Sequence, residues 1–524
     1  MVHQNIQARL KLRVLPVWLC LFIVASAANT CRAADISPLT ISRLIDQSLE
    51  IDAADHSQFA SDAKFLRRVT LDLAGRIPTI VEVHDYLSNT SESRRIEVID
   101  RLMHSGVHYR NMATFWRRAW VPQADTPEFD SVTEDFERWL VHRLQKGTRY
   151  DELVVEILTL DHATNTPAST TPIGFYKANL SRPENLAASA TRAFLGINLD
   201  CAQCHDHPFS RWTREQFWQT AAFFAEPQTD EKSESQPPKV RVPDIEMELE
   251  PALLTNAKIN WPQNLDSVSL RLILVDWMKA NEEQLLAKNA VNRLWAHYFG
   301  EAIIEPVDDL SRDEVQTGAR ARLLNDLSAA FIASGYDLNL MTEGIVSSNA
   351  YRLSSSNTDK SSEADSDAPG PFRITRATVR GLTGEQLFDS LQTAANLPSE
   401  LRDVEGRSDR SQRSEFASRF YIENSFSAER SISQSLTLMN GSFVNELTTK
   451  QENLMLASIL SSPFMNFDEQ IDTVFIAVLG RHARKTEMKV VKQSFESHVD
   501  ATRESRLGNL FWVLVNSTEF NTNH

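Results

Sequence analysis

Residues 181–225 read SRPENLAASATRAFLGINLDCAQCHDHPFSRWTREQFWQTAAFFA, and this stretch contains two helix signals around a short loop. Ser181, with a proline two residues later, starts a helix that ends at Gly196, because serine caps orphan backbone N–H groups and glycine accepts the left-handed conformation. Thr213 caps a second helix in the same way. The segment Cys201–Pro208 is therefore predicted to be a loop between two helices.

The same helical periodicity recurs along most of the chain and predicts a mainly α fold. The composition changes at residues 226–251, where prolines and charges dominate, and this segment includes a possible short strand pair around 240–249. We therefore predict two helical domains, 34–225 and 252–524, joined by this irregular acidic and proline-rich segment, with at most short strands. A low-complexity stretch at about 354–371 predicts a disordered surface insertion in the second domain.

The N-terminus has the pattern of a secretory signal peptide. Three basic residues precede the apolar run at 14–28, and small residues follow it. The run is shorter than the about 20 residues that a membrane-spanning helix needs, which disfavours an anchor, and a lipoprotein signal ending at Cys31 is a further alternative. We expect residues 1–33 to be removed, leaving a periplasmic or secreted protein with no transmembrane segment.

Composition and missing motifs narrow the function classes. The formal net charge is −16, and an acidic surface repels phosphate backbones, so general nucleic-acid binding is not expected. Phosphate-binding glycine loops, the zinc-protease motif and the nucleophile elbow are all missing from the sequence. The run Glu305-Pro306-Val307-Asp308-Asp309 brings three carboxylates together, as a capping or salt-bridged turn or as a cation or acid–base site. No reaction follows from these features.

The most specific signal is Cys201-Ala202-Gln203-Cys204-His205, the C-x-x-C-H pattern of c-type haem attachment. Two thiols at this spacing can each form a thioether with one porphyrin vinyl group, and the imidazole of His205 can then ligate the iron. These are also the only cysteines that remain once the signal peptide is removed. The sequence thus favours haem c as cofactor, held by Cys201, Cys204 and His205.

Other interpretations of the loop stay open. A zinc ion could use both cysteines together with His205 and His207, although structural zinc sites usually draw on two separated pairs of ligands. A disulfide between Cys201 and Cys204 suits an oxidising compartment. The two thiols could also be inert.

Several longer motifs resemble two planctomycete-type domain families. Residues in the first half resemble the cytochrome-c-associated PSCyt domain, in the motifs FLRRVTLDLAGRIPT (65–79), NLDCAQCHDHPFSRWT (198–213) and FWQTAAFFA (217–225). Residues in the second half resemble the PSD domain, in the motifs NRLWAHYFGEAIIEPVDDL (292–310), SGYDLNLM (334–341), LTGEQLFDSL (382–391), SLTLMNG (435–441) and LFWVLVNSTEFNTNH (510–524). Both families are of unknown function. The resemblance implies a secreted or periplasmic protein, and it places the family's cysteine–histidine motif on Cys201, Cys204 and His205.

Two function hypotheses follow from the sequence. In the first, an exported haem protein transfers electrons or supports redox chemistry, with an unidentified redox partner. In the second, a non-catalytic binding or assembly module acts at the cell surface, on an extracellular polymer for example, and the loop is a structural disulfide or metal staple. Haem content distinguishes the two hypotheses.

Overall fold

The structure is a computed structural model, and it describes part of the chain. The described residues are 36–524 without 52–57, 126–128, 162–166, 228–235, 263, 311–316, 356–371, 398–407, 421–431 and 498–500. The signal peptide expected at 1–33 lies outside the described residues, as does nearly all of the insertion expected at 354–371.

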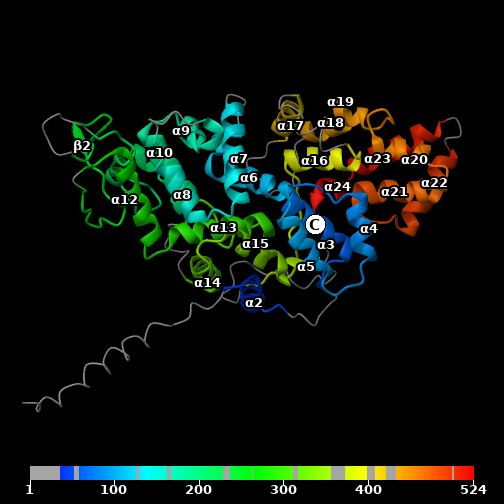
Figure 1. The fold of residues 1–524 in the computed structure, drawn as a ribbon, viewed down its shortest axis with the longest axis horizontal. Coiled ribbons are helices and arrows are strands. Elements are labelled where there is room, and N and C mark those ends of the chain that lie inside the picture. The colour runs from blue at the N-terminus through cyan, green and yellow to red at the C-terminus, as the bar shows by residue number, and fades with distance from the viewer. Residues whose placement is uncertain are drawn as a thin grey trace, which may run out of the picture. The chain divides into compact units, whose positions relative to one another are not determined.

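The first half of the chain is helical, as the sequence predicts (Figure 1). Its α-helices are α2 (Pro38–Ser48), α3 (Asp62–Ala74), α4 (Ile80–Ser88), α5 (Arg94–Met103), α6 (Gly106–Trp120), α7 (Asp130–Gln145), α8 (Tyr150–Leu158), α9 (Ile173–Ala178), α10 (Pro183–Ala190) and α11 (Arg214–Ala222). Thr213 caps α11 with its side chain, and the helix that α10 begins ends at Gly196 with a φ of 60°. Both helices around the cysteine loop are therefore confirmed. The cap predicted at Ser181 is wrong, because Ser181 lies one residue before the N-cap, Arg182, and has a left-handed backbone with a φ of 50°.

The second half adds two short strand pairs to a further set of helices. The helices are α12 (Ser267–Ala280), α13 (Leu285–Phe299), α14 (Ala319–Ala333), α15 (Leu338–Ser347), α16 (Gly384–Ala394), α17 (Ser408–Arg419), α18 (Ile432–Asn440), α19 (Ser442–Glu446), α20 (Leu454–Ser461), α21 (Phe467–Leu479), α22 (Lys485–Ser497), α23 (Arg503–Val515) and α24 (Thr518–Asn521). Strand β1 (Val240–Val242) pairs antiparallel with β2 (Met247–Leu249), and β3 (Arg380–Gly381) pairs antiparallel with β4 (Thr522–Asn523). The mainly α class and the hairpin expected at 240–249 are confirmed.

One helix lies where the sequence shows only a polar stretch. Helix α17 spans Ser408–Arg419 and has no apolar face that would mark it in the sequence. It is held by its neighbours instead: Arg413 binds Asp389 of α16 at 2.9 Å, and Phe416 packs against Phe388 with ring centroids 5.6 Å apart. Tertiary contacts rather than periodicity specify this helix.

Helices from the two halves of the sequence pack against one another. Helix α2 lies on α14 and α15, α8 packs on α12, and α3 contacts β4. Leu71 and Ile77, near the end of α3, belong to the same hydrophobic core as α16, α21 and α23. Residues Ser37–His524 consequently form one compact unit. The domain boundary at 226–251 stays a prediction.

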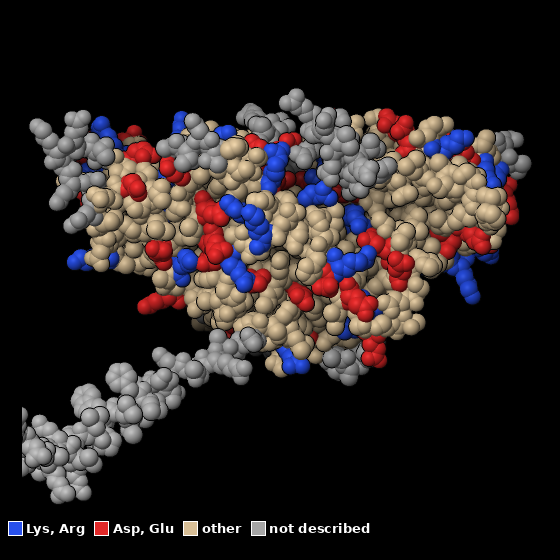
Figure 2. All heavy atoms as spheres, in the orientation of Figure 1, with Lys and Arg blue, Asp and Glu red and all other residues tan. Residues whose placement is uncertain are grey.

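The described surface mixes charges of both signs. On the face drawn in Figure 2, the Lys and Arg side chains and the Asp and Glu side chains are interspersed. Among the described residues, no helix combines the length and apolar character required to cross a lipid bilayer.

Candidate functional site

The cysteine loop begins after a change of helix geometry. Helix α10 continues as a π-helical turn, η5 (Thr191–Leu195), before Gly196 ends it. The carbonyl of Gly196 accepts a hydrogen bond from the Leu310 N–H at 2.7 Å, and a Cβ at this glycine would lie 3.0 Å from the Leu310 side chain. Glycine is therefore needed here both for its positive φ and for the close approach of the 310 segment. This packing fixes where the loop leaves the helix.

Three hydrogen bonds close the loop and attach it to α11. The His207 N–H donates to the Trp212 carbonyl at 2.8 Å, and the Trp218 indole N–H donates to the Gln203 carbonyl at 3.1 Å. The Asp206 carboxylate accepts the Arg214 N–H, in the first turn of α11, at 2.8 Å. A carboxylate at this position satisfies an orphan N–H and suits the positive end of the helix dipole. The loop is thus a closed turn built on a helix N-terminus.

Both cysteines are presented to solvent on this loop. Cys201 lies in the short 3₁₀ turn η6 (Asp200–Gln203), and Cys204 follows it directly. Both side chains are exposed and both thiols are free, whereas Ala202 between them is buried. Exposed thiols are the ones available for covalent chemistry.

The two histidines of the loop are held in opposite tautomers. The Nδ1 atom of His205 lies 2.8 Å from the Asp206 carbonyl oxygen, so Nδ1 donates, and in the neutral ring the proton is absent from Nε2. The Nδ1 atom of His207 accepts the Phe209 N–H at 3.2 Å, so in the neutral ring the proton is on Nε2. Metal-binding histidines typically donate their second ring N–H to a carbonyl or carboxylate. His205 has this arrangement and His207 does not.

Aromatic side chains surround the loop in two different environments. Trp212 and Trp218 are each 4% exposed and belong to the core. The Arg211 guanidinium covers the Trp212 ring at 4.7 Å. Phe209, at the tip of the loop, is 83% exposed. Of these three rings, only that of Phe209 is presented to solvent.

Ion pairs flank the loop. Arg192 of the π-helical turn lies 3.2 Å from Asp200, and Arg211 lies 2.9 Å from Glu283. All four side chains are between 27% and 49% exposed, so these pairs are solvated and each contributes at most about 1 kcal/mol. They orient the loop more than they stabilise it.

The described residues show no ready-made metal cluster. Across the described part of the chain, no three Cys, His, Asp or Glu side chains gather in a way that could hold a metal ion. This holds also for the zinc alternative at Cys201, Cys204, His205 and His207. The carboxylate run at 305–309 is a turn in which Glu305 accepts the Ala302 N–H at 2.9 Å.

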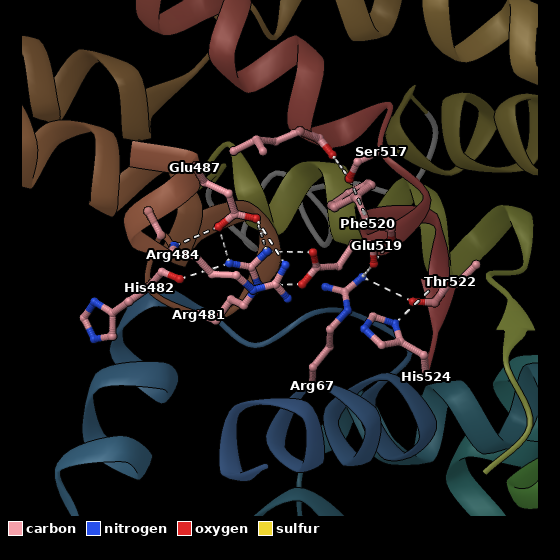
Figure 3. A network of polar contacts seen from close by, with 12 residues as sticks. Arg67, Arg481, His482, Arg484, Glu487, Ser517, Glu519, Phe520, Thr522 and His524 are labelled. Carbon is pink, nitrogen blue, oxygen red and sulfur yellow. Dashed lines mark hydrogen bonds and ion pairs between the residues drawn. The ribbon is translucent and has the colours of Figure 1, made fainter. Parts of the chain in front are cut away.

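A group of buried charges, which sequence patterns did not indicate, lies in α3. Arg67, Arg68 and Asp72 are each 3% exposed or less. Asp72 binds Arg380 through two contacts of 2.9 Å, and Arg67 donates to the carbonyls of residues near the C-terminus (Figure 3). All of these partners are at least 300 residues away in sequence, so no local signal could have identified them. Their contacts are with other side chains and the backbone, which is typical of a structural role.

Fold and loop together define a mainly α-helical chain with an exposed cysteine–histidine loop between two helices. Residues 40–229 match the PSCyt2 family, a protein of unknown function (DUF1549), and residues 270–420 match the PSD1 family, a protein of unknown function (DUF1553). The PSCyt2 match precedes the PSD1 match, in the order that the sequence motifs predict. No curated protein and no solved structure matches it.

Proposed function

We propose that the loop attaches a c-type haem through Cys201 and Cys204, with His205 as an iron ligand. The protein is then an exported electron-transfer or redox protein, periplasmic or secreted. One observation carries this proposal: two exposed free thiols at the C-x-x-C spacing are followed by a histidine whose Nδ1 is already committed to the Asp206 carbonyl.

The chemistry of attachment fits the residues present. Each thiol adds across one vinyl group, so that a C–S bond forms, the thiol proton passes to the terminal vinyl carbon, and no oxidant is consumed. Both Sγ atoms are open to a large planar ligand because neither side chain is buried. The bound haem would supply a one-electron redox couple, and tuning by nearby hydrogen bonds and burial would set its potential.

His205 is preferred to His207 as the iron ligand on electrostatic grounds. A ligand nitrogen needs an unprotonated lone pair, and His205 has one at Nε2 because Nδ1 donates to a carbonyl oxygen. The same carbonyl fixes the orientation of the ring and increases the basicity of Nε2. His207 would have to lose the Phe209 N–H bond or its own Nε2 proton first.

A protein with one haem needs a redox partner. One haem stores one electron, so the protein needs a second redox protein or an oxidisable extracellular substrate with which to exchange it. The loop is a suitable point of exchange because it lies on the surface of the described structure.

The test is covalent haem on a denaturing gel, using full-length protein from a host that matures c-type cytochromes. We expect a haem-stained band in the wild type and no band in the Cys201→Ala, Cys204→Ala double variant. His205→Ala should keep the band but lose the native optical spectrum, and His84→Ala, a control at an exposed histidine of α4 outside the loop, should keep both.

A wild-type protein without a haem band would overturn the proposal. Mass spectrometry of the peptide carrying both cysteines then identifies the replacement. A mass two hydrogen atoms lower than that of the dithiol form indicates a disulfide, and the non-catalytic surface module becomes the better interpretation.

A further inference from the structure

We propose that Phe209 is the side chain that packs against the porphyrin held at Cys201 and Cys204, and that it sets the polarity around the iron. This inference rests on the proposed haem attachment and goes one step further, because it assigns the apolar contact of the site to a single residue.

The backbone of Phe209 is held on the same loop as the thiols. Its N–H donates to His207 Nδ1 at 3.2 Å, and the His207 N–H donates to the Trp212 carbonyl at 2.8 Å, which closes the turn on both sides of Phe209. The ring is nonetheless 83% exposed. An exposed aromatic side chain on a hydrogen-bonded backbone, four residues after the proposed iron ligand, is available to receive a flat apolar ligand and does not fill the core.

The other two aromatic residues near the loop are buried and make contacts within the protein. Trp218 is 4% exposed and its indole N–H donates to the Gln203 carbonyl, so its side chain is used to hold the loop against α11. Trp212 is 4% exposed and lies under the Arg211 guanidinium. Neither ring can turn toward a ligand without breaking the loop's own contacts. Among the described aromatic residues of the loop, this leaves Phe209.

A single exposed phenylalanine is common on protein surfaces and would carry no inference alone. Phe464 demonstrates this and also provides the control. It is 91% exposed, follows a proline as Phe209 does, and its N–H lies 3.4 Å from the hydroxyl of Ser462, two residues earlier. The two rings have the same local setting, but only Phe209 shares a loop with the two thiols.

The consequence is a shift in redox behaviour. An apolar ring over the haem excludes water, which disfavours the more highly charged oxidised state and raises the reduction potential. Phe209→Ala should admit water and lower the potential, and small hydrophilic oxidants should reach the haem faster. Phe209→Leu, which keeps an apolar side chain, should recover part of the difference.

The experiment compares full-length wild type, Phe209→Ala, Phe209→Leu and Phe464→Ala. Haem staining on a denaturing gel measures attachment, spectroelectrochemical titration measures the midpoint potential, and stopped-flow mixing with ferricyanide measures the rate of reoxidation. We expect equal haem staining in all four proteins, a lower potential and a several-fold faster reoxidation in Phe209→Ala, and wild-type values in Phe464→Ala.

The outcomes separate this inference from the function on which it rests. Haem staining in all four proteins, with Phe209→Ala and Phe464→Ala both equal to wild type in potential and reoxidation rate, overturns the role of Phe209 and leaves haem attachment intact. Absence of haem from the wild type overturns both. Equal thermal unfolding of the two alanine variants checks that each has folded.

Discussion

At the scale of single residues, Asp72 shows how this protein accommodates a buried charge. Its Oδ1 atom accepts from Arg380 at 2.9 Å and from the Asn523 amide at 2.7 Å, and its Oδ2 atom accepts from Arg380 at 2.9 Å and from the Tyr351 hydroxyl at 2.6 Å. The side chain is 1% exposed. A carboxylate removed from water is tolerated only when it is paired and hydrogen-bonded in this way.

Replacing Asp72 with alanine should therefore destabilise the fold strongly. The Arg380 guanidinium, in a side chain that is only 10% exposed, would lose its paired charge, and breaking a buried ion pair on one side costs about 3–5 kcal/mol. Urea unfolding followed by circular dichroism measures the change. Asp326→Ala, at an exposed position of α14, is the control and should stay within about 0.5 kcal/mol of wild type. Equal stability of the two variants would contradict the assigned role.

Residue-level features of the cysteine loop divide into those that the sequence predicts and those that only coordinates provide. The spacing of Cys201, Cys204 and His205 is visible in the sequence because the chemistry of attachment demands it. The opposite tautomers of His205 and His207 cannot be predicted from the sequence, because they depend on which backbone group hydrogen-bonds to each Nδ1 atom. The exposure of Phe209 could not be predicted either, because a phenylalanine close to two tryptophans in the sequence is expected to be a core residue.

At the scale of helices and strands, the capping residues made most of the fold predictable. Ser61, Thr213 and Thr383 each precede a helix at the position expected for an N-cap, and Gly75 and Gly480 end helices with positive φ. Such capping signals depend on residues that are close together in the sequence, so they can be recognised without the structure. Helix α17 was missed because its stability depends on contacts with α16, and buried charges in α3 were missed because charged residues on a helix normally face solvent.

One ion pair links α6 to α16 and should control the response of the fold to acid. Arg118 lies 2.8 Å from Glu385, in the first turn of α16. Burial alone would raise the pKa of Glu385, but the guanidinium groups of Arg118, Arg413 and Arg117 outweigh it and lower this pKa to about 2. In the unfolded chain the same carboxyl has a pKa of about 4.3.

The lowered pKa of Glu385 makes the free energy of unfolding larger at neutral pH than at acid pH. Because the unfolded chain takes up the Glu385 proton first, the stabilisation is complete above about pH 4.3 and is lost as the pH falls toward 2, an effect on the order of 3 kcal/mol. Glu385→Gln should be less stable than wild type at pH 7, and the difference should shrink between pH 4.5 and about 2. Urea midpoints measured across this range test it. A gap between the proteins that does not change with pH would refute the assignment.

At the scale of the whole molecule, the last residues of the chain lie against a helix near its beginning (Figure 3). One Arg67 nitrogen lies within hydrogen-bond distance of the carbonyls of Glu519 at 3.0 Å, Phe520 at 2.7 Å and Thr522 at 3.5 Å. Burial lowers the pKa of Arg67 to about 10, so it stays protonated at neutral pH. Glu519 in turn binds Arg481 at 2.6 Å. This network attaches the C-terminal residues to α3.

Such connections predict that cutting the chain between the two family domains will not separate them. Arg67, Asp72 and Arg118 each bind a residue of the second half, and Leu71 and Ile77 share its hydrophobic core. A site-specific protease sequence inserted between Asp244 and Ile245, in the exposed turn between β1 and β2, allows the cut to be made in folded protein. We expect the two fragments to co-elute on size exclusion in native buffer and to unfold in one transition.

The Arg67→Ala variant tests whether this side chain contributes to the association. Its carbonyl partners lose their hydrogen-bond donor, which costs about 1–3 kcal/mol. The nicked variant should therefore dissociate at a lower urea concentration than nicked wild type, whereas nicked Asp326→Ala should match wild type. Wild-type fragments that separate without denaturant would mean that each half folds on its own and that the contacts of α3 add little to the association.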